Sequence, residues 1–262
     1  MRLLGFLYGL GAYALFQGTC LYSAGFIANI GVPKSIDSPR PGSFAGALAV
    51  DTLLLMLFVL QHSGMARPAF KRWWTRFVPS YLERSTYVIA SCLALIALFA
   101  FWQPLGGTLW QLTGPAAAVA TGIGAAGWLV VLSSTFLINH FDLFGLRQVW
   151  LNLLGRPYTP LDFKLKGAYN YVRHPLYVGW LMAFWGAATM TVTHLFFALM
   201  TTGYILKAIG WEEKDLLDAH PEYAEYRRRV PALVPLGRAV ARRMGSVTTL
   251  KSGEYSREAT AS

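Results

Sequence analysis

Long apolar stretches separated by short polar segments form the main pattern of this chain. Each of the first four stretches has about the 20 residues that a helix needs to cross the hydrocarbon core of a bilayer. They run over residues 3–30, 44–62, 85–102 and 115–139. The pattern therefore predicts four membrane-spanning helices in the first half of the chain.

A fifth apolar stretch, residues 175–210, is too long for one span. Its roughly 35 residues would form a helix of about 50 Å, against a hydrocarbon core of about 30 Å. The run Thr189-Met-Thr-Val-Thr-His194 interrupts it with polar and β-branched side chains. We therefore expect a tight hairpin of two helices, with its break at this run and a first helix too short to cross the bilayer completely.

Composition agrees with a membrane protein. Of 262 residues, 55% are hydrophobic and only 14% are charged, which is too apolar for a soluble domain of this size. The predicted fold class is all-α: a polytopic integral membrane helical bundle of five to six transmembrane segments, with a C-terminal helical hairpin and a cytoplasmic cap. We expect a four-span bundle over residues 1–139, a functional half over residues 140–236 and a disordered basic tail over residues 237–262.

The net charge of +10 comes from basic residues that cluster between the apolar stretches instead of along one face. This placement indicates membrane orientation and argues against nucleic-acid binding. Segments 63–84 and 140–173 are rich in bases and are expected in the cytoplasm, whereas segment 103–114 has no Lys, Arg, Asp or Glu and is expected on the far side. Both termini would then be cytoplasmic. Cys20 and Cys92 stand alone inside apolar stretches, which argues against a disulfide framework or a thiolate metal site.

Ionisable residues gather at the cytoplasmic ends of the predicted segments. They are His62, His140, Arg173, His174, Glu212 and Glu213. Charged groups at such depths are costly unless they line a polar site, so their concentration indicates a functional site. Two other interpretations stay open. In the first, Arg173 and His174 only mark the membrane boundary. In the second, His62 and His140 are axial ligands in a membrane haem protein.

Gly122, Gly124 and Gly127 spell the dinucleotide-binding pattern G-x-G-x-x-G. That pattern needs a strand before it and a ribose-binding acid after it, and here it lies inside an apolar span without either. Small residues at helical spacing allow neighbouring helices to approach closely, so we expect a helix-packing surface. Gly5 and Gly9 predict the same for the first span.

The motifs of the second half follow one another in a specific order. Arg173-His174-Pro175-x-Tyr177-x-Gly179 precedes the hairpin, Glu212-Glu213 follows it, and Tyr223-x-x-Tyr226-x-x-Arg229-Val230-Pro231 comes last. Over residues 169–235 this order resembles the isoprenylcysteine carboxyl methyltransferase superfamily, which are integral-membrane enzymes that use S-adenosylmethionine. Residues 138–148, 189–194 and 201–209 resemble a narrower family, the bacterial methanethiol S-methyltransferases.

The resemblance implies S-adenosylmethionine as the cofactor, in a site closed by residues 212–235. The side chains offer a matching partner for each part of that molecule. We expect its carboxylate at Arg173, His174 and the helix start at Pro175, its ammonium or ribose hydroxyls at Glu212 or Glu213, and its adenine or sulfonium at Tyr177, Tyr223 and Tyr226.

The same resemblance implies methanethiol as the methyl acceptor and dimethyl sulfide as the product, with an isoprenylcysteine or another lipophilic acceptor as the alternative. A small thiol is mostly protonated at neutral pH, so it needs a base or a nearby cation. We expect His140 as the base, oriented by Asp142, with Arg147 and Arg229 stabilising the thiolate; a cap on the fourth span is the equal alternative for His140. The expected setting is a bacterial cytoplasmic membrane, with the site facing the cytoplasm, the lipid bilayer and the thiol as partners, and no metal or nucleic acid.

Overall fold

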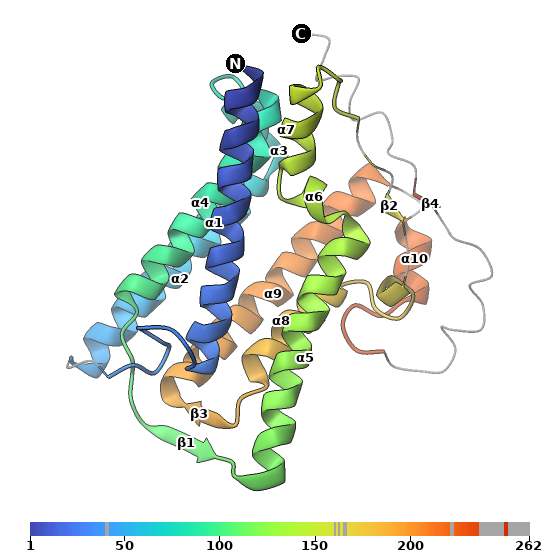
Figure 1. The fold of residues 1–262 in the computed structure, drawn as a ribbon. Coiled ribbons are helices and arrows are strands. Elements are labelled where there is room, and N and C mark those ends of the chain that lie inside the picture. Colours follow the sequence, from blue (N-terminus) through green and yellow to red (C-terminus); the bar gives the residue numbers. More distant parts are fainter. Residues whose placement is uncertain are drawn as a thin grey trace.

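Within the described residues, five helices are long and apolar enough to cross a membrane. They are α1 (Arg2–Ala28), α2 (Phe44–Ala66), α4 (Ser80–Phe101), α5 (Gly114–Ile138) and α9 (Val192–Ala219) (Figure 1). The computed structural model describes residues 1–39, 42–159, 161, 163–164, 167–220, 223–235 and 249–250. The bundle confirms the predicted all-α, polytopic membrane fold. The expected tail, residues 237–262, lies outside the described residues except for 249–250.

Shorter elements connect the spans. The helices among them are α3 (Pro68–Trp74), α6 (His140–Leu143), α7 (Leu146–Leu153), η1 (Gly167–Asn170), α8 (Pro175–Trp185) and α10 (Tyr223–Arg229). The strands are β1 (Thr108–Gln111), β2 (Phe163–Lys164), β3 (Thr189–Thr191) and β4 (Thr249–Leu250). Strand β1 pairs antiparallel with β3, with Trp110 opposite Met190, and β2 pairs antiparallel with β4. The sequence pattern did not predict these pairs, because two to four residues are too few to show an alternation.

Helices α8 and α9 form the predicted hairpin, and its break lies at the Thr-rich run. Helix α8 has 11 residues, about 16 Å of helix, or roughly half of the hydrocarbon core. It ends at Trp185 with Gly186 as its C-cap, and β3 then leads into α9. The Thr191 side chain accepts a hydrogen bond from the His194 N–H at 3.0 Å and caps the start of α9. The expectation of a short first helix in the hairpin is confirmed, because α8 is shorter than the helices that are long enough to cross a membrane.

Buried polar side chains hold the loop that follows α4. Asp51, fully buried in α2, accepts a hydrogen bond from the Gln103 N–H at 2.8 Å. Thr193, fully buried in α9, accepts one from the Leu105 N–H at 2.8 Å. A backbone N–H that leaves an apolar span needs a partner, and two different spans supply it here. The end of the bundle that carries β1 and β3 is thereby tied to α2 and α9 (Figure 1).

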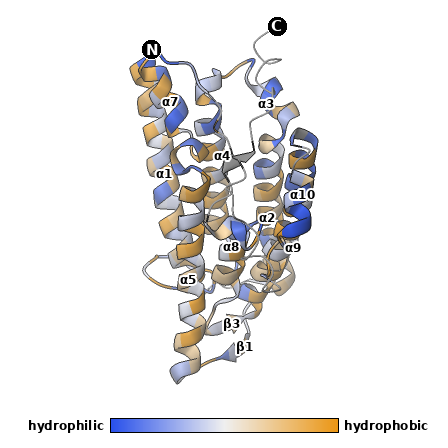
Figure 2. Cartoon of the chain, turned by 90° about the vertical axis from the view of Figure 1, so that its right-hand side faces the viewer, coloured by the Kyte–Doolittle hydropathy of each residue, from blue (hydrophilic) through white to orange (hydrophobic). Residues whose placement is uncertain are grey.

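Hydrophobic residues predominate along the spans, and hydrophilic residues gather at α10 (Figure 2). Leu53, Leu129 and Leu206 are each more than half exposed, as expected of side chains that face lipid. The inner faces of α1, α2, α4, α8 and α9 share one buried core, whose largest fully buried side chain is Trp102. The indole N–H of Trp102 donates to the Ile36 carbonyl at 3.1 Å, so its polar atom is satisfied inside this core.

Glycines bring α5 and α8 into close contact. A Cβ on Gly127 would lie 2.4 Å from the Ala183 nitrogen, and one on Gly124 would lie 2.4 Å from the Gly186 carbonyl oxygen. From the other side, a Cβ on Gly179 would lie 2.7 Å from the Val131 nitrogen. Such distances leave no room for a side chain, so the two backbones touch. The G-x-G-x-x-G pattern is therefore a packing surface, as predicted, through its second and third glycines.

The glycine pair of α1 makes close contacts of the same kind. A Cβ on Gly5 would lie 2.7 Å from the Tyr81 ring, and one on Gly9 would lie 2.5 Å from Cγ2 of Val149 on α7. The predicted close approach of a neighbouring element to this face of the first span is confirmed.

Replacing Gly127 tests whether the α5–α8 contact holds the hairpin in place. We expect Gly127→Ala to lower the free energy of unfolding by about 2 kcal/mol, because the methyl group would push apart two backbones in contact. Gly122→Ala is the matched control, since a Cβ there meets no atom within 4 Å. It should be neutral or stabilise the helix by up to about 1 kcal/mol. Equilibrium unfolding of the purified protein in detergent measures both, and equal effects would contradict the packing role.

Candidate active site

The loop before α8 pairs with the segment after α10. The Arg173 N–H donates to the Pro231 carbonyl at 2.9 Å, and the His174 N–H donates to the Ala232 carbonyl at 3.1 Å. Pro175 lies in the first turn of α8, where its missing N–H needs no partner. These contacts place α10 beside Arg173 and His174.

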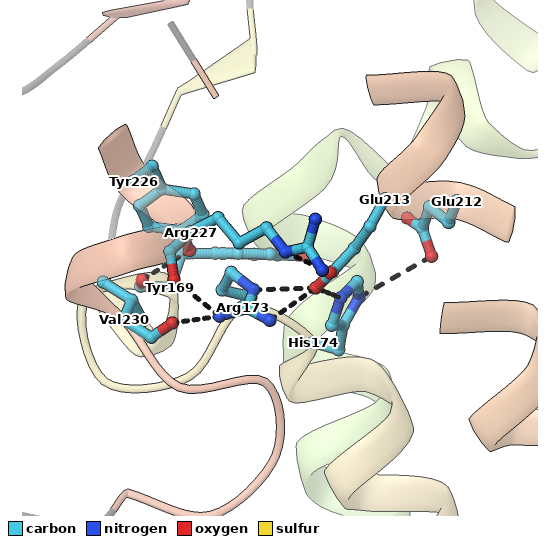
Figure 3. Close-up of polar contacts among 8 residues, drawn as sticks. All are labelled: Tyr169, Arg173, His174, Glu212, Glu213, Tyr226, Arg227 and Val230. Atoms are coloured by element: carbon cyan, nitrogen blue, oxygen red, sulfur yellow. Dashed lines mark hydrogen bonds and ion pairs between the residues drawn. The ribbon is translucent and has the colours of Figure 1, made fainter. Parts of the chain in front are cut away.

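The carboxylate of Glu213, on α9, is the centre of a charged cluster formed by Arg173, His174, Glu212, Glu213 and Arg227 (Figure 3). Its Oε1 lies 2.7 Å from both Nε and Nη2 of Arg173 and 3.0 Å from Nε2 of His174. Its Oε2 lies 3.1 Å from Nε of Arg227. The Glu213 side chain is only 6% exposed, so these donors replace the water that the carboxylate loses on burial.

Arg173 also stabilises the end of α10. Its Nη1 donates to the carbonyl of Arg227 at 3.0 Å and to the carbonyl of Val230. The last carbonyls of a helix have no partner within the helix and carry partial negative charge, so a guanidinium there is favourable. One buried arginine thus joins the carboxylate of α9 to the C-terminal turn of α10 (Figure 3).

Glu212 and Arg227 form the open rim of the charged cluster. The Glu212 side chain is 49% exposed, and its Oε2 lies 3.6 Å from Nδ1 of His174, which is longer than a hydrogen bond. The Arg227 side chain is 50% exposed. The rim therefore offers a carboxylate and a guanidinium with unused hydrogen-bonding capacity, which suits a ligand carrying both an ammonium and a carboxylate.

Tyr223 and Tyr226 anchor α10 inside the protein. Both are buried against Tyr169 and Val230, and the Tyr226 hydroxyl donates to the Tyr169 carbonyl at 2.8 Å. Burial raises the pKa of Tyr223 to about 12, and it also raises the pKa of Tyr226, so both phenols stay neutral. In this structure they pack in a core instead of presenting a face for adenine. Tyr177 differs, because it is partly exposed and its ring centroid lies 5.6 Å from that of His174.

His140 lies in a separate, buried position at the start of α6. Its Nδ1 is 2.8 Å from Thr135 Oγ1, and its Nε2 is 2.7 Å from the Tyr13 hydroxyl. Since Thr135 donates its own proton to the Leu132 carbonyl, Nδ1 carries the imidazole proton and Nε2 accepts from Tyr13. The ring also stacks on Phe136 at 4.2 Å. Among the described residues, the contacts of His140 include no member of the charged cluster.

Asp142 and Arg147 pair with each other near α7. Arg147 Nη1 donates to Asp142 Oδ1 at 3.1 Å and to the Thr159 carbonyl at 2.8 Å, and the Tyr158 hydroxyl donates to Asp142 Oδ2 at 3.2 Å. The expectation that Asp142 orients His140 is corrected, because hydroxyl groups take both imidazole nitrogens and Asp142 binds Arg147.

Arg227, and not Arg229, is the arginine of α10 that reaches the charged cluster. Arg229 instead forms an ion pair with Glu225 on its own helix, with Nε 2.5 Å from Oε1, and its side chain is 63% exposed. Sequence reasoning selected Arg229 from its motif and missed Arg227. Helical spacing does not separate the two, since Arg227 follows the buried Tyr223 by four residues and Arg229 follows the buried Tyr226 by three.

The chain is similar to known proteins over most of its length. It is 54% identical to a methanethiol S-methyltransferase of Crocosphaera subtropica over 231 residues, which cover 87% of this chain and 91% of that relative. The chain belongs to the methanethiol S-methyltransferase family. It is also 47% identical to methanethiol S-methyltransferase 1 of Bradyrhizobium diazoefficiens, over 91% of this chain and 85% of that relative. The chain is more distantly similar to nurim of Rattus norvegicus. The two are 34% identical over 66% of this chain and 70% of that relative.

Membership of the methanethiol S-methyltransferase family confirms the resemblance predicted from the second half of the chain. The match to the Crocosphaera relative covers 87% of the chain, so it includes most of the first half, where the motifs had indicated only membrane spans. No protein-family profile and no solved structure matches the chain.

The adjacent glutamates test how far the fold depends on the buried carboxylate. We expect Glu213→Gln to lower the free energy of unfolding by about 3 kcal/mol, because it leaves Arg173 buried without its counter-charge. Glu212→Gln, one residue away and half exposed, should change it by less than about 0.5 kcal/mol. Equilibrium unfolding in detergent compares the two, and similar losses would show that the buried ion pairs are not what stabilises this region.

The protonation of His140 predicts a pH dependence of stability. Burial lowers its pKa below the ordinary value of 6.5, so the unfolded chain binds a proton more readily than the folded protein does. The contribution of His140 to stability is therefore complete above about pH 6.5 and should decrease as the pH falls toward the lowered pKa. His140→Gln should remove this decrease. Unfolding midpoints of both proteins between about pH 5 and 8 measure this difference. If the midpoints of the two proteins changed in parallel with pH, the predicted contribution of His140 would be contradicted.

Proposed function

We propose that this chain transfers a methyl group from S-adenosylmethionine to methanethiol and releases dimethyl sulfide. The observation that carries the proposal is the 54% identity, over 231 residues, to a protein named methanethiol S-methyltransferase. The charged cluster supports it, because it lies in the segment whose motifs resemble the donor-binding half of the larger superfamily.

The residues of the rim fit the amino-acid end of the proposed donor. Glu212 can accept hydrogen bonds from an ammonium group, and Arg227 can donate to a carboxylate, while both side chains are about half exposed. Tyr177 offers a partly exposed ring on the same side, suited to a cation–π contact with a sulfonium. The donor supplies a methyl group on a positively charged sulfur.

The chain's own contribution is to hold charges in fixed positions. Glu213 holds Arg173, His174 and Arg227 in place before any ligand arrives, so the site needs little reorganisation when the ligand binds. Bringing a thiolate to a sulfonium cancels two opposite charges, and an apolar site favours that cancellation more than water does. Positioning of the two reactants in line would supply much of the rate.

The proposed setting is a bacterial cytoplasmic membrane, with the site and both termini on the cytoplasmic side. The basic residues between the apolar stretches support this orientation, because positively charged loops stay in the cytoplasm. Residues 140–236 would form the catalytic half. His140, Asp142, Arg147 and Arg229 are engaged with other partners in this structure, and the proposal does not depend on them.

Headspace gas chromatography tests the function directly. Membranes that contain the chain should release dimethyl sulfide only when both methanethiol and S-adenosylmethionine are supplied. If a folded protein that binds S-adenosylhomocysteine releases none, methanethiol is not the acceptor, and an isoprenylcysteine substrate becomes the next one to assay.

Matched variants in the same assay test the donor site. Arg227→Ala should raise the KM for S-adenosylmethionine about tenfold or more, the loss expected for one charge-assisted hydrogen bond. Arg228→Ala is the control, because Arg228 is 71% exposed and pairs only with Glu225 among the described residues. Its KM should stay within about twofold of the wild type. Equal KM values for the two variants would exclude Arg227 from the donor site.

A further inference from the structure

A second polar group of side chains lies between the spans α2, α4 and α9. This hydroxyl cluster consists of His62, Ser63, Tyr87, Ser91 and Tyr204. The Tyr87 hydroxyl lies 3.0 Å from both ring nitrogens of His62, and Ser91 Oγ lies 3.2 Å from Nδ1. Ser63 Oγ lies 2.9 Å from the Tyr204 hydroxyl. Three spans thus direct polar groups toward one another.

Hydrogen bonds between spans are common in membrane proteins and on their own need no function. The hydroxyl cluster differs in containing an imidazole, and an ionisable side chain within a span is by default a sign of a functional site. His62, Tyr87 and Tyr204 are also partly exposed, unlike the buried core around Trp102. The ring of Phe58 stacks on His62, with centroids 5.0 Å apart, so an apolar surface adjoins the polar groups.

Tyr177 joins the hydroxyl cluster to the charged cluster. Its ring lies 5.6 Å from that of His174, and it interacts electrostatically with Glu212 on the rim. It also interacts with Tyr204 and Tyr87. A residue on α8 therefore interacts both with the rim where the donor is proposed to bind and with two tyrosines of the hydroxyl cluster.

His62 keeps a ring nitrogen that can change partner. In His140 each nitrogen has its own hydroxyl partner, at 2.8 and 2.7 Å, and neither is free to accept a proton from a ligand. In His62 the Ser91 hydroxyl lies 3.2 Å from Nδ1, and the Tyr87 hydroxyl lies 3.0 Å from both nitrogens and can donate to only one of them at a time. With Ser91 at Nδ1, a ligand S–H can take the place of the Tyr87 hydroxyl at Nε2.

Arg84 supplies positive charge to the hydroxyl cluster. Its guanidinium carbon lies 5.7 Å from the centroid of the Tyr87 ring, and it interacts electrostatically with both Tyr87 and His62. A fixed positive charge beside the hydroxyl cluster stabilises a thiolate formed next to it, because it lowers the energy of the anion that remains when the proton leaves.

We propose that the hydroxyl cluster is the acceptor site, where Tyr87 holds the thiol and His62 takes its proton. The inference rests on the methyl transfer proposed above. The S–H bond of the thiol breaks and its proton goes to His62, and the sulfur lone pair forms the new S–CH3 bond. The bond between the methyl carbon and the donor sulfur breaks, and its electron pair leaves the donor as a neutral thioether. His62 then releases the proton to water.

Kinetics of matched variants test the acceptor site. His62→Gln should lower kcat with methanethiol about 100-fold near pH 7, the range expected for a lost general base. Tyr87→Phe should raise the KM for the thiol. The control is Tyr8→Phe, which removes the 3.0 Å hydrogen bond between Tyr8 and Thr86, also a hydroxyl pair between spans but outside the hydroxyl cluster. Its kcat and its KM for the thiol should stay within about twofold of the wild-type values.

The pH profile separates a base from a structural residue. Without a base, the rate follows the fraction of the thiol that is already thiolate, and this fraction rises about tenfold per pH unit below the pKa of the thiol. The loss of rate in His62→Gln should therefore become up to about tenfold smaller for each unit by which the pH rises in that range. The titratable and charged groups around His62 and Tyr87 are Glu83, Arg84 and Tyr87 on α4, Tyr204 on α9 and Tyr177 on α8, with Glu212 beyond it. Side chains of these types ordinarily titrate outside about pH 6 to 9, so a change in that window reports His62 or the thiol.

Binding measurements give a readout that does not depend on turnover. The Kd for S-adenosylhomocysteine should stay within about twofold of the wild type in His62→Gln and Tyr87→Phe, since neither residue belongs to the donor rim. With S-adenosylhomocysteine bound, dimethyl sulfide should protect His62 from acylation by diethyl pyrocarbonate, measured by peptide mass spectrometry. His220, partly exposed at the end of α9, is the internal reference.

The outcomes distinguish this inference from the function on which it rests. If the wild type makes dimethyl sulfide while His62→Gln and Tyr87→Phe match it at every pH, the acceptor site is wrong and the function stands. Loss of S-adenosylhomocysteine binding in His62→Gln would assign His62 to the donor side and also overturn the inference. If the wild type makes no dimethyl sulfide, the proposed function fails, and the acceptor site fails with it.

Discussion

A carboxylate buried among two guanidinium groups and an imidazole is the interaction on which the second half of this structure depends. Glu213 contacts groups from the loop before α8, from the start of α8 and from α10, while it belongs to α9. A buried charge is tolerable only when its partners are all present, so these four segments must assemble together. The apolar bundle makes this possible, because the glycine contact with α5 fixes α8 and thereby the position of His174.

Hydropathy was sufficient to place the spans because a bilayer imposes both a length and an apolar surface on every helix that crosses it. The stretch 44–62 became α2, Phe44–Ala66, and the break predicted at the Thr-rich run separates α8 from α9. The short elements were not predictable in this way. Helices α6 and α7 and the β1–β3 pair depend on contacts with residues far away in sequence, such as Met190 opposite Trp110.

Motif order was sufficient to group Arg173, His174, Glu212 and Glu213, because the two legs of a hairpin return to the same side of the membrane. It was not sufficient to choose among three consecutive arginines, since each residue turns a helix by about 100° and the docking of α10 decides which one faces Glu213. Nor does composition distinguish a tyrosine that stacks on a ligand from one that anchors a helix. The partner of His140, Tyr13, lies 127 residues away, beyond any local pattern.

The half-length of α8 has a consequence for how the chain is made. A segment of 11 apolar residues is too short to be inserted into a bilayer as an independent span. During synthesis α8 has no stable position of its own until α9 has been inserted and α5 is available to cover its glycine face. The two arginines and the carboxylate can therefore meet only after Arg227 has been translated, and a chain that stops within α9 before Glu213 would leave Arg173 without its counter-charge.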